Sequence, residues 1–425
     1  MFNIIESEPQ KKTTRFIRTI EIIGVFCFAL LSAYFSIRRS SQLHPVIYEY
    51  GYHGEIRTSD IWFDADIPKQ KFLMTDSSFI GHRITSEHPV EPLLLFSVGS
   101  ILTKVLGLIT INAIRIFTAG IAGIFVIGMY VLLRLNGTRV LDSFIFTGLA
   151  SVSSSAIFWL PVPEAFTLGS ISIILALCML LFQNKVRNPL LLHVFLNFST
   201  FSMTATNWVV GFLSTIFSMK WYKALLAFVG SLVLASLFWI IERIIFPYAQ
   251  YFFTGSGKLA KFTYIPSFER MVDSIRVFFF HSVVIPEAKI VTISTELSRL
   301  SIQQSLFTYR SLFGYFALFF WILLLLSGVI ISLKSVRKYT IYKVVWGSLI
   351  FFVLLHVVFG DETFLYSMHF LPLLILLASS GSKTKLRPFI LAIASCATVF
   401  FLITNMAEFT ASAEFLRNIG ILVNG

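Results

Sequence analysis

The sequence predicts an all-α polytopic membrane protein, with residues 1–425 forming a single membrane domain. Hydrophobic residues make up 56% of the chain and charged residues only 13%, whereas a soluble protein of this size carries about 25% charged residues. Apolar runs of about 20 residues, long enough to cross the hydrocarbon core of a bilayer, recur along the chain. The alternating apolar segments of about ten residues that build a membrane β-barrel are absent.

The first predicted span covers residues 17–37. Its apolar run is too long for a cleavable signal peptide and no small-residue cleavage site ends it, so we expect a retained helix. Cys27, Cys178 and Cys396 all fall inside apolar runs, which argues against a disulfide framework.

The later spans follow from the lengths of the other apolar runs. Residues 190–219 are apolar throughout but too long for one ordinary span, so we expect two short spans there that turn at Thr206, Asn207 and Trp208. The other spans are expected at 112–133, 143–160, 165–182, 222–241, 312–333, 344–359, 365–380 and 388–405. The bundle is therefore expected to contain about eleven transmembrane helices.

Residues 90–108 are apolar, but their pattern differs from that of a span. Polar and small residues recur at three- and four-residue spacing on one helical face, and apolar residues mostly occupy the opposite side. The first set is Ser97, Ser100, Thr103, Lys104 and Gly107, and the second is Leu94, Leu95, Val98, Leu102 and Val105. This distribution predicts an amphipathic helix that lies at the membrane interface.

The basic residues support this choice of spans. With the N-terminus in the cytoplasm and 90–108 at the interface, the short loops PVPEAF, ATNW and GDETFLYS face outward and contain no Lys or Arg. Short cytoplasmic loops carry an excess of Lys and Arg, and a span at 90–108 would reverse this bias. The cytoplasmic set comprises Lys11, Lys12, Arg15, Arg18, Arg134, Arg139, Lys185, Arg187, Lys220, Lys223, Lys334, Arg337, Lys338, Lys343, Lys383, Lys385 and Arg387.

Two long segments, 38–111 and 243–311, face outward in this topology, and so does the C-terminus. Loops longer than about 15 residues are usually functional, and the first segment collects aspartates, glutamates and histidines. The formal net charge of +12 is explained by membrane topology, so no nucleic-acid partner is expected. Walker, dinucleotide-binding, zinc-type and GxSxG motifs are absent.

Three aspartates in the stretch DIWFDADIPKQKF are candidates for a general base, which must reach the proton of an attacking hydroxyl. Pro68 biases Ile67 toward extended backbone, in which Asp64 and Asp66 share a side. We rank Asp66 first as the catalytic residue, Asp64 second and Asp60 third. The alternative is that Asp66 or Ile67 caps a short helix that begins near Pro68.

His82, Arg83 and His88 precede the predicted interfacial helix. They are candidates for contact with a phosphate or an acceptor, because cationic side chains bind phosphate oxygens well. Lipid headgroups offer an equally good explanation for His82 and Arg83, and His88-Pro89 also suits the start of a helix.

Glu164 and a later group of residues complete the candidate site. Glu362, Tyr366 and His369 fall at three- and four-residue spacing and so share one helical face, and an ionisable residue near the end of a span is usually functional. The alternatives are that Glu164 balances a helix dipole and that Tyr366 and its neighbours contact headgroups. Basic residues of 243–311 could supply a phosphate ligand, but the sequence singles out none of them.

The arrangement resembles the GT-C superfamily of membrane glycosyltransferases, which includes protein O-mannosyltransferases and aminoarabinose transferases of lipid A. In that family a long outer loop with an acidic catalytic residue follows the first span, and a motif like HPPLxxLL opens an interfacial helix. Here DIWFDADIPKQKF and HPVEPLLLF resemble these features, and PVPEAFTLGSISIILAL and FGDETFLYSMHFLPLL resemble later outer positions. The chain departs from the family plan in lacking a tight Asp-Glu dyad next to the first span and a large soluble C-terminal domain.

The resemblance implies an inverting transfer of a hexose from a polyprenyl-phosphate sugar donor to a hydroxyl of a lipid-linked glycan or surface polysaccharide. The enzyme is expected in the bacterial inner membrane, with its active site facing the periplasm. Mg or Mn is compatible with this chemistry, but no ligand pattern requires a metal. The resemblance leaves two other functions open, namely an O-antigen-type polymerase and a non-enzymatic flippase or transporter of lipid-linked sugar. The site residues expected are Asp66 and Asp64 for catalysis, with Asp60, His82, Arg83, His88, Glu164, Glu362, Tyr366 and His369 for substrate binding.

Overall fold

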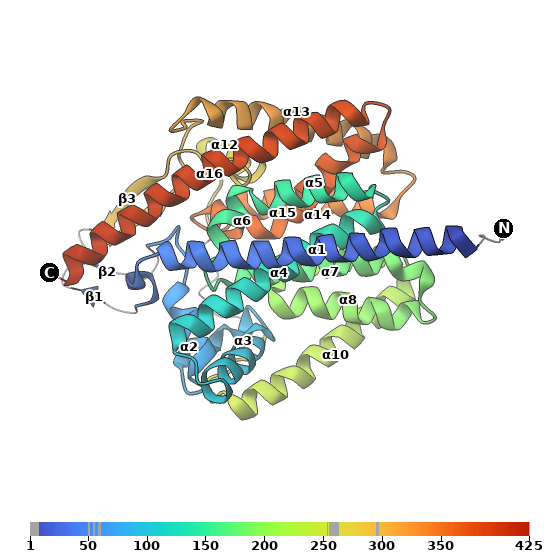
Figure 1. Cartoon of the computed structure of the whole chain (residues 1–425). Coiled ribbons are helices and arrows are strands. Elements are labelled where there is room, and N and C mark those ends of the chain that lie inside the picture. The colour runs from blue at the N-terminus through green and yellow to red at the C-terminus, as the bar shows by residue number, and fades with distance from the viewer. Residues whose placement is uncertain are drawn as a thin grey trace.

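The computed structural model describes residues 8–49, 52–53, 56–57, 61–252, 254, 263–294 and 297–424. Within these ranges helices dominate, and eight of them are long and apolar enough to cross a membrane. The expected all-α polytopic membrane protein is therefore confirmed in outline. Figure 1 shows the long helices packed side by side, with the N-terminus and the C-terminus at opposite ends of the bundle.

The long helices lie close to the predicted limits, except that the first begins well before residue 17 and the last extends well beyond residue 405. They are α1 (Glu8–Gln42), α4 (Thr110–Leu135), α7 (Ala165–Phe182), α10 (Trp221–Ile245), α13 (Leu312–Ser335), α14 (Thr340–Val358), α15 (Ser367–Ser379) and α16 (Arg387–Asn424). Short 3-10 turns extend α7 (η4, Gln183–Lys185) and flank α15 (η7, Thr363–Tyr366; η8, Ser380–Lys383).

The span expected at 143–160 is not one helix. It divides into α5 (Val140–Ser151) and α6 (Ser154–Trp159). The break is stable inside the bundle because a neighbouring segment takes up the freed polar groups: Ser154 and Ser155 donate their backbone N–H groups to carbonyls of residues 282–283, at 3.0 and 3.1 Å. Serine hydroxyls compete with helical hydrogen bonds, and irregular backbone at membrane depth is tolerated where protein satisfies it.

The stretch 190–219 forms two short helices, α8 (Pro189–Met203) and α9 (Trp208–Ile216), joined by a 3-10 turn at Ala205–Asn207 (η5). The predicted turn at 206–208 lies at this junction. None of α5, α6, α8 and α9 is among the eight helices long and apolar enough to cross a membrane.

The segment after α1 consists of short elements. They are η1 (Pro45–Tyr48), the strands β1 (Tyr52–His53) and β2 (Ile56–Arg57), α2 (Ile67–Thr75), η2 (Ile80–Ser86), α3 (Glu91–Ser100) and a π-turn at Ile101–Val105. At ten residues, α3 is too short to span a bilayer. The two-sided pattern predicted for 90–108 is wrong in detail, because Leu94 and Val105 are exposed together with Ser97 and Lys104. The buried side carries Glu91, Leu95, Gly99 and Leu102 instead.

The segment between α10 and α13 contains a helix and a β-hairpin. Helix α12 (Phe268–Arg276) continues into a π-turn at Val277–His281, and β3 (Lys289–Ser294) pairs antiparallel with β4 (Leu297–Ser301). The prediction of an all-helical chain missed these strands. The β-branched residues of KIVTIS favour extended backbone, a signal that the sequence does carry.

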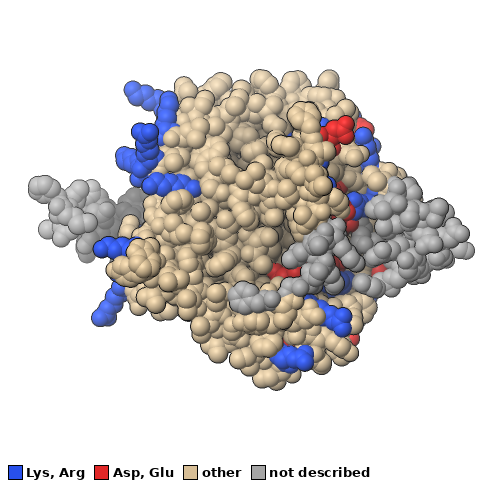
Figure 2. All heavy atoms as spheres, turned by 180° about the vertical axis from the view of Figure 1, so that it is seen from behind, with Lys and Arg blue, Asp and Glu red and all other residues tan. Residues whose placement is uncertain are grey.

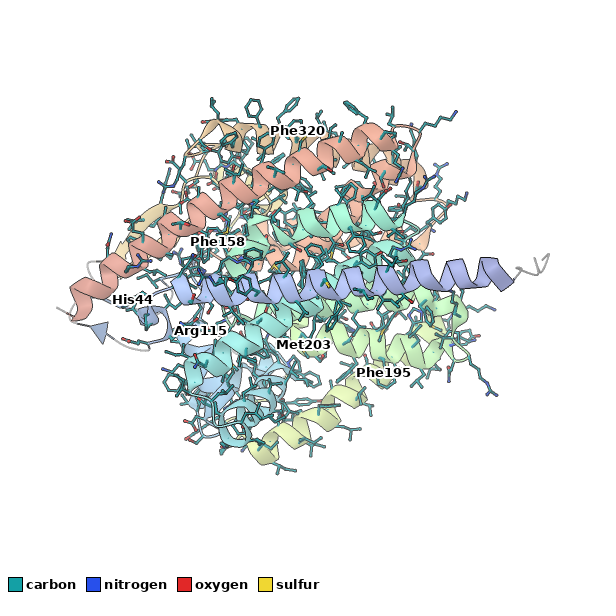
Figure 3. The ribbon with its side chains drawn as sticks, viewed as in Figure 1. His44, Arg115, Phe158, Phe195, Met203 and Phe320 are labelled. Carbon is teal, nitrogen blue, oxygen red and sulfur yellow. The ribbon has the colours of Figure 1, made fainter. Side chains whose placement is uncertain are left out.

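A cluster of aromatic rings holds the segment that precedes α2. Trp62 and Phe63 are fully buried, and their rings pack against Phe158, Phe364 and Phe409 at centroid distances of 5.3–5.8 Å. In Figure 3 Phe158 lies inside the bundle, whereas Phe195, 45% exposed, lies on its flank. The aromatic cluster therefore fixes residues 62–63 against three separate parts of the chain, namely α6, η7 and α16.

Gly99 allows α3 to approach α2 closely, and its replacement tests this packing. A Cβ at Gly99 would meet the backbone carbonyl oxygen of Met74 at 2.2 Å, whereas a Cβ at Gly120 would meet nothing within 4 Å. Gly99→Ala should destabilise the protein by about 1–3 kcal/mol through overpacking. Gly120→Ala should be neutral or stabilise α4 by about 0.5–1 kcal/mol. Thermal unfolding midpoints of the two variants in one detergent compare them directly, and equal midpoints would contradict the close approach.

Candidate functional site

The two ends of the bundle differ in charge. Figure 2 shows Lys and Arg alone gathered at the end from which α1 starts, and Asp and Glu, mixed with other Lys and Arg, on the opposite half. The acidic half holds α2 and the β3–β4 hairpin, and the loop between α14 and α15 joins that hairpin through the hydrogen bond from Ser301 to Glu362. The predicted site residues that the structure describes therefore lie at one end of the molecule.

Asp64 sits on a strained stretch of backbone. Phe63 and Asp64 both have left-handed conformations, with φ angles of 49° and 67°. Non-glycine residues are uncommon in this region, each at a cost of about 1–3 kcal/mol, and they persist only where the surroundings impose them. The aromatic cluster and a backbone hydrogen bond from Leu300 to the carbonyl of Ile61 (3.0 Å) supply that constraint.

The carboxylate of Asp64 pairs with Arg299 of β4. The Arg299 Nη1 donates to Asp64 Oδ1 at 2.5 Å, and the side chains are only 12% and 23% exposed. Burial raises the pKa of Asp64 to about 6, against the opposing effect of the Arg299 guanidinium, and the nearby charges of Asp361 and Asp66 raise it further. Asp64 therefore changes its protonation state close to neutral pH.

Glu362 lies beside this ion pair. It is fully buried and accepts a hydrogen bond from the Ser301 hydroxyl of β4. Burial raises the pKa of Glu362 to about 8, so the group is mostly neutral at pH 7. The preceding residue, Asp361, accepts a hydrogen bond from the Tyr264 hydroxyl, which raises the pKa of that phenol.

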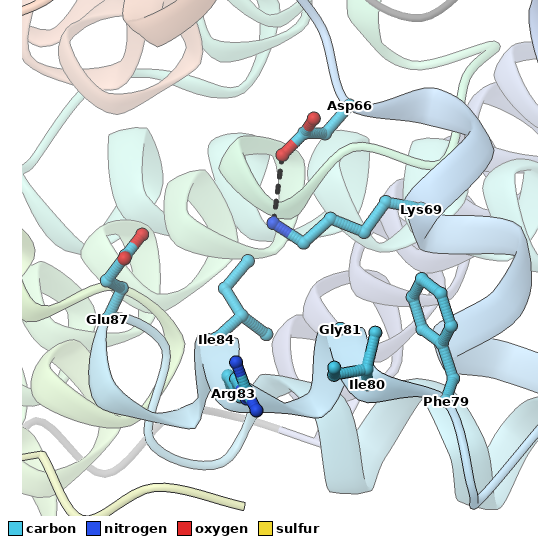
Figure 4. A pocket seen from close by; sticks show the side chains of 8 residues that line it. All are labelled: Asp66, Lys69, Phe79, Ile80, Gly81, Arg83, Ile84 and Glu87. Carbon is cyan, nitrogen blue, oxygen red and sulfur yellow. Dashed lines mark hydrogen bonds and ion pairs between the residues drawn. The ribbon is translucent and has the colours of Figure 1, made fainter. Parts of the chain in front are cut away.

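Asp66 precedes α2 and lines a cavity of about 300 Å³. It occupies the N-cap position of α2, as predicted by the alternative in which Asp66 caps a helix that begins near Pro68. Its side chain, however, makes no cap hydrogen bond. It pairs instead with Lys69 at 2.9 Å, and its side chain is 50% exposed. Figure 4 shows this pair facing Glu87 across the cavity, with Arg83 on η2 and the apolar side chains of Phe79 and Ile80 also lining it. We call this space the α2–η2 cavity.

A second cavity, of about 310 Å³, lies against the β3–β4 hairpin. Its lining is polar and includes Arg270, Asp273, Lys289, Arg299, Gln303 and Asp361. Arg270 donates to the backbone carbonyls of Val357 and Gly360 and lies over the Tyr264 ring. Arg299 lines this hairpin cavity and pairs with Asp64, which itself lines neither of the two cavities.

Two glutamates lie buried close to the α2–η2 cavity. Glu164 caps α7, because its Oε1 accepts a hydrogen bond from the Ala165 N–H at 3.1 Å, which agrees with the helix-terminal alternative for this residue. Its Oε2 has no partner among the described residues. Glu91, in the first turn of α3, is fully buried, and neither carboxyl oxygen has a partner there. Burial raises the pKa of Glu91 to about 8 and that of Glu164 well above its ordinary value.

His88, Tyr366 and His369 converge on the ring of Phe166. The ring centroids lie 6.2, 4.7 and 5.0 Å from that of Phe166, respectively. His88 Nδ1 also lies 2.6 Å from the Met203 carbonyl oxygen and donates to it in the corresponding tautomer. Tyr366 and His369 belong to η7 and α15, so the single helical face predicted to include Glu362 is interrupted at Ser367.

The remaining predicted residues have other positions. His82 stacks on Phe246 at 3.8 Å and its Nε2 lies 2.8 Å from the Asp76 carbonyl oxygen, which is a structural role. Arg83 lines the α2–η2 cavity and lies over the Tyr248 ring. Asp60 lies outside the described residues.

Sequence reasoning missed Lys69, Glu91 and Ser301 and did not single out Arg299. Lys69 had a local signal, since it follows Asp66 by three residues on a helix. Arg299 had none, because its partner is 235 residues away in the sequence. Glu91 lies within the HPVEPLLLF motif, where a glutamate in a first helical turn suggests only a helix-dipole contact.

In the ranges that the structure describes, no three His, Cys, Asp or Glu side chains are placed to hold a metal ion together. The chain matches no protein-family model, no curated protein and no solved structure.

Proposed function

We propose that this protein is an integral-membrane glycosyltransferase that moves a hexose from a polyprenyl-phosphate donor to an acceptor hydroxyl of a glycan or glycolipid. The observation that carries the proposal is Asp64, a carboxylate at the acidic end of the bundle that is held by strained backbone and by Arg299, a residue that lines the hairpin cavity. We infer that Asp64 is the general base and that the transfer is a single, inverting displacement.

The properties of Asp64 suit this role. A general base works best when its pKa lies near the working pH, and the pKa of about 6 leaves Asp64 mostly ionised at pH 7. The pairing with Arg299 fixes the direction of one carboxylate oxygen and leaves the second to accept the acceptor proton. Pre-set geometry of this kind lowers the barrier without reorganisation.

The two cavities differ in a way that suits the two substrates. The α2–η2 cavity combines cationic Lys69 and Arg83 with apolar Phe79 and Ile80, which fits a lipid phosphate and the start of its prenyl chain. The hairpin cavity is lined by polar side chains of both charges, which fits the hydroxyl groups of a glycan acceptor. The leaving phosphate then gains negative charge next to Lys69 and Arg83, which stabilise it.

The orientation follows from the charge distribution. The end at which Lys and Arg predominate (Figure 2) is assigned to the cytoplasm by the excess of positive charge in cytoplasmic loops, and the two acidic residues Glu21 and Asp142 are paired there with Arg134 and Arg387. This orientation gives about eleven crossings, with the short helices α5–α6, α8 and α9 completing the eight long ones. The segments 38–111 and 243–311 then face outward, toward the periplasm if the membrane is a bacterial inner membrane.

Release of lipid phosphate tests the proposed function. Purified protein in detergent is incubated with polyprenyl-phosphate hexoses and with candidate glycolipid acceptors, and the free polyprenyl phosphate is quantified. We expect acceptor-dependent release that follows protein concentration. Absence of release with every donor and acceptor pair would contradict the enzymatic function.

A further inference from the structure

We propose that α12 is an in-plane membrane anchor, whose apolar face inserts into the outer leaflet beside the end of α14. The inference goes beyond the proposed function, because it concerns the lipid that this helix meets and holds whatever molecule the protein acts on. With nine residues, α12 is too short to cross a membrane, and it lies in the segment between the long helices α10 and α13.

Helix α12 has an exposed apolar face and a polar face that is turned toward the protein. Four exposed apolar residues recur at three- and four-residue spacing and so share one side of the helix. They are Phe268, Met271, Val272 and Ile275. The opposite side carries Arg270 and Asp273, which line the hairpin cavity, and the buried Ser274. A helix with one charged face and one apolar, aromatic face is typical of the membrane interface.

Hydrogen bonds join α12 to the end of α14. The Ser274 hydroxyl donates to the carbonyl of residue 356 at 3.1 Å, and the Arg270 guanidinium donates to the carbonyls of residues 357 and 360. Just before α12, the Tyr264 N–H donates to the carbonyl of residue 358 at 2.8 Å. Because α14 is long and apolar enough to cross a membrane and ends at Val358, α12 lies at the level where this helix leaves the hydrocarbon.

Lipid is the partner that fits the apolar face at this level. Leu354, one turn before the end of α14, is 62% exposed, and Ile350, one turn earlier, is also exposed, as expected for side chains of a span that face acyl chains. Phe268 of α12 is 79% exposed. The apolar face of α12 therefore adds to the lipid-facing surface of the bundle where acyl chains meet headgroups.

Insertion of the apolar face also sets the depth of the hairpin cavity. Ser267, the N-cap of α12, and Glu269, Arg270 and Asp273 within the helix supply part of the lining of that cavity. An interfacial helix lies in the plane of the membrane, so its polar side is held among the headgroups. The hairpin cavity then lies at the depth at which a molecule anchored in the leaflet presents its polar head.

Depth-dependent fluorescence quenching tests the anchor without requiring turnover. Single cysteines replace Phe268, Glu269 or Val272 in protein whose three native cysteines are replaced by alanine, and each carries an environment-sensitive NBD probe in proteoliposomes. The lipids carry a nitroxide quencher either on the headgroup or on the acyl chain. The probes at 268 and 272 should lie about 5–10 Å into the headgroup–acyl boundary, so the acyl-chain nitroxide should quench them more than it quenches the probe at 269. The headgroup nitroxide should give the reverse order.

Two reference positions calibrate the measurement. Leu354→Cys on the exposed side of α14 should be quenched by the acyl-chain nitroxide, and Glu414→Cys, exposed well beyond residue 405 on α16, should show the weakest such quenching. Probes at 268 and 272 that behave like the probe at 414 would overturn the anchor, because the face would then lie in water. Apolar emission at 268 and 272 without quenching by either nitroxide would also overturn it, because a second copy of the chain would then cover the face. Absence of sugar transfer would count against the proposed function alone.

Discussion

Asp64→Asn should lower the rate of sugar transfer by a factor of about 10²–10⁴, the usual contribution of a general base. The asparagine keeps the size of the side chain and can still meet Arg299, but it cannot accept a proton. Folding should be preserved, since Trp62 and Phe63 and not the carboxylate anchor the segment. Acceptor-dependent release of polyprenyl phosphate by the purified variant, next to Glu414→Gln as the exposed control, measures the loss.

Asp66→Asn is the informative comparison, because the sequence alone ranks Asp66 first. The structure leaves Asp66 half exposed and paired with Lys69, so its loss should weaken donor binding and raise KM more than it lowers kcat. If Asp66→Asn abolished kcat while Asp64→Asn retained near-normal turnover, Asp66 would be the base and the role given to Asp64 would be wrong.

Arg299→Gln should move the acid limb of the pH–rate profile to higher pH. The rate requires ionised Asp64 and so rises with pH through its pKa, which is about 6 in the wild type. The Arg299 guanidinium lowers that pKa, so its removal raises the midpoint, by about 1–3 pH units for a close opposite charge. At pH 6–7 the variant should therefore be much slower, with recovery toward alkaline pH.

The matching measurement is the pH dependence of kcat/KM for wild type, Arg299→Gln and Arg299→Lys. The lysine variant keeps a positive charge without the planar geometry of the guanidinium, and its midpoint should lie between the other two. A midpoint that stays unchanged in Arg299→Gln would show that Asp64 does not set the acid limb.

The features that follow from local sequence were largely predictable. The long apolar runs fix the long helices, and the length of 190–219 indicated two short helices where α8 and α9 lie. The division of 143–160 into two helices was not predictable. The run Ser153 to Ser155 is compatible with a continuous helix, and it breaks because the backbone of residues 282–283 offers other hydrogen-bond partners. A partner more than 120 residues away leaves no mark on a local pattern.

The same distinction holds for the candidate site. The sequence placed Asp64, Asp66, Glu164 and Glu362 in outward segments, and the structure brings them to one end of the bundle. The sequence ranks Asp66 above Asp64, whereas our proposal favours Asp64 on tertiary features that a local pattern does not contain. The left-handed backbone at Asp64 is imposed by ring contacts of Phe63 with Phe158 and Phe364, which come from distant helices.

The account depends most on one claim, that the carboxylate-rich end of the bundle lies outside the cytoplasm. Single cysteines at the exposed Ser78, near α2, and at the exposed Lys338, between α13 and α14, report on the two ends. They are introduced into protein whose Cys27, Cys178 and Cys396 are replaced by alanine. In intact cells a membrane-impermeant maleimide should label Ser78→Cys and should label Lys338→Cys only after the membrane is opened. Labelling of Lys338→Cys in intact cells, with Ser78→Cys protected, would contradict the account.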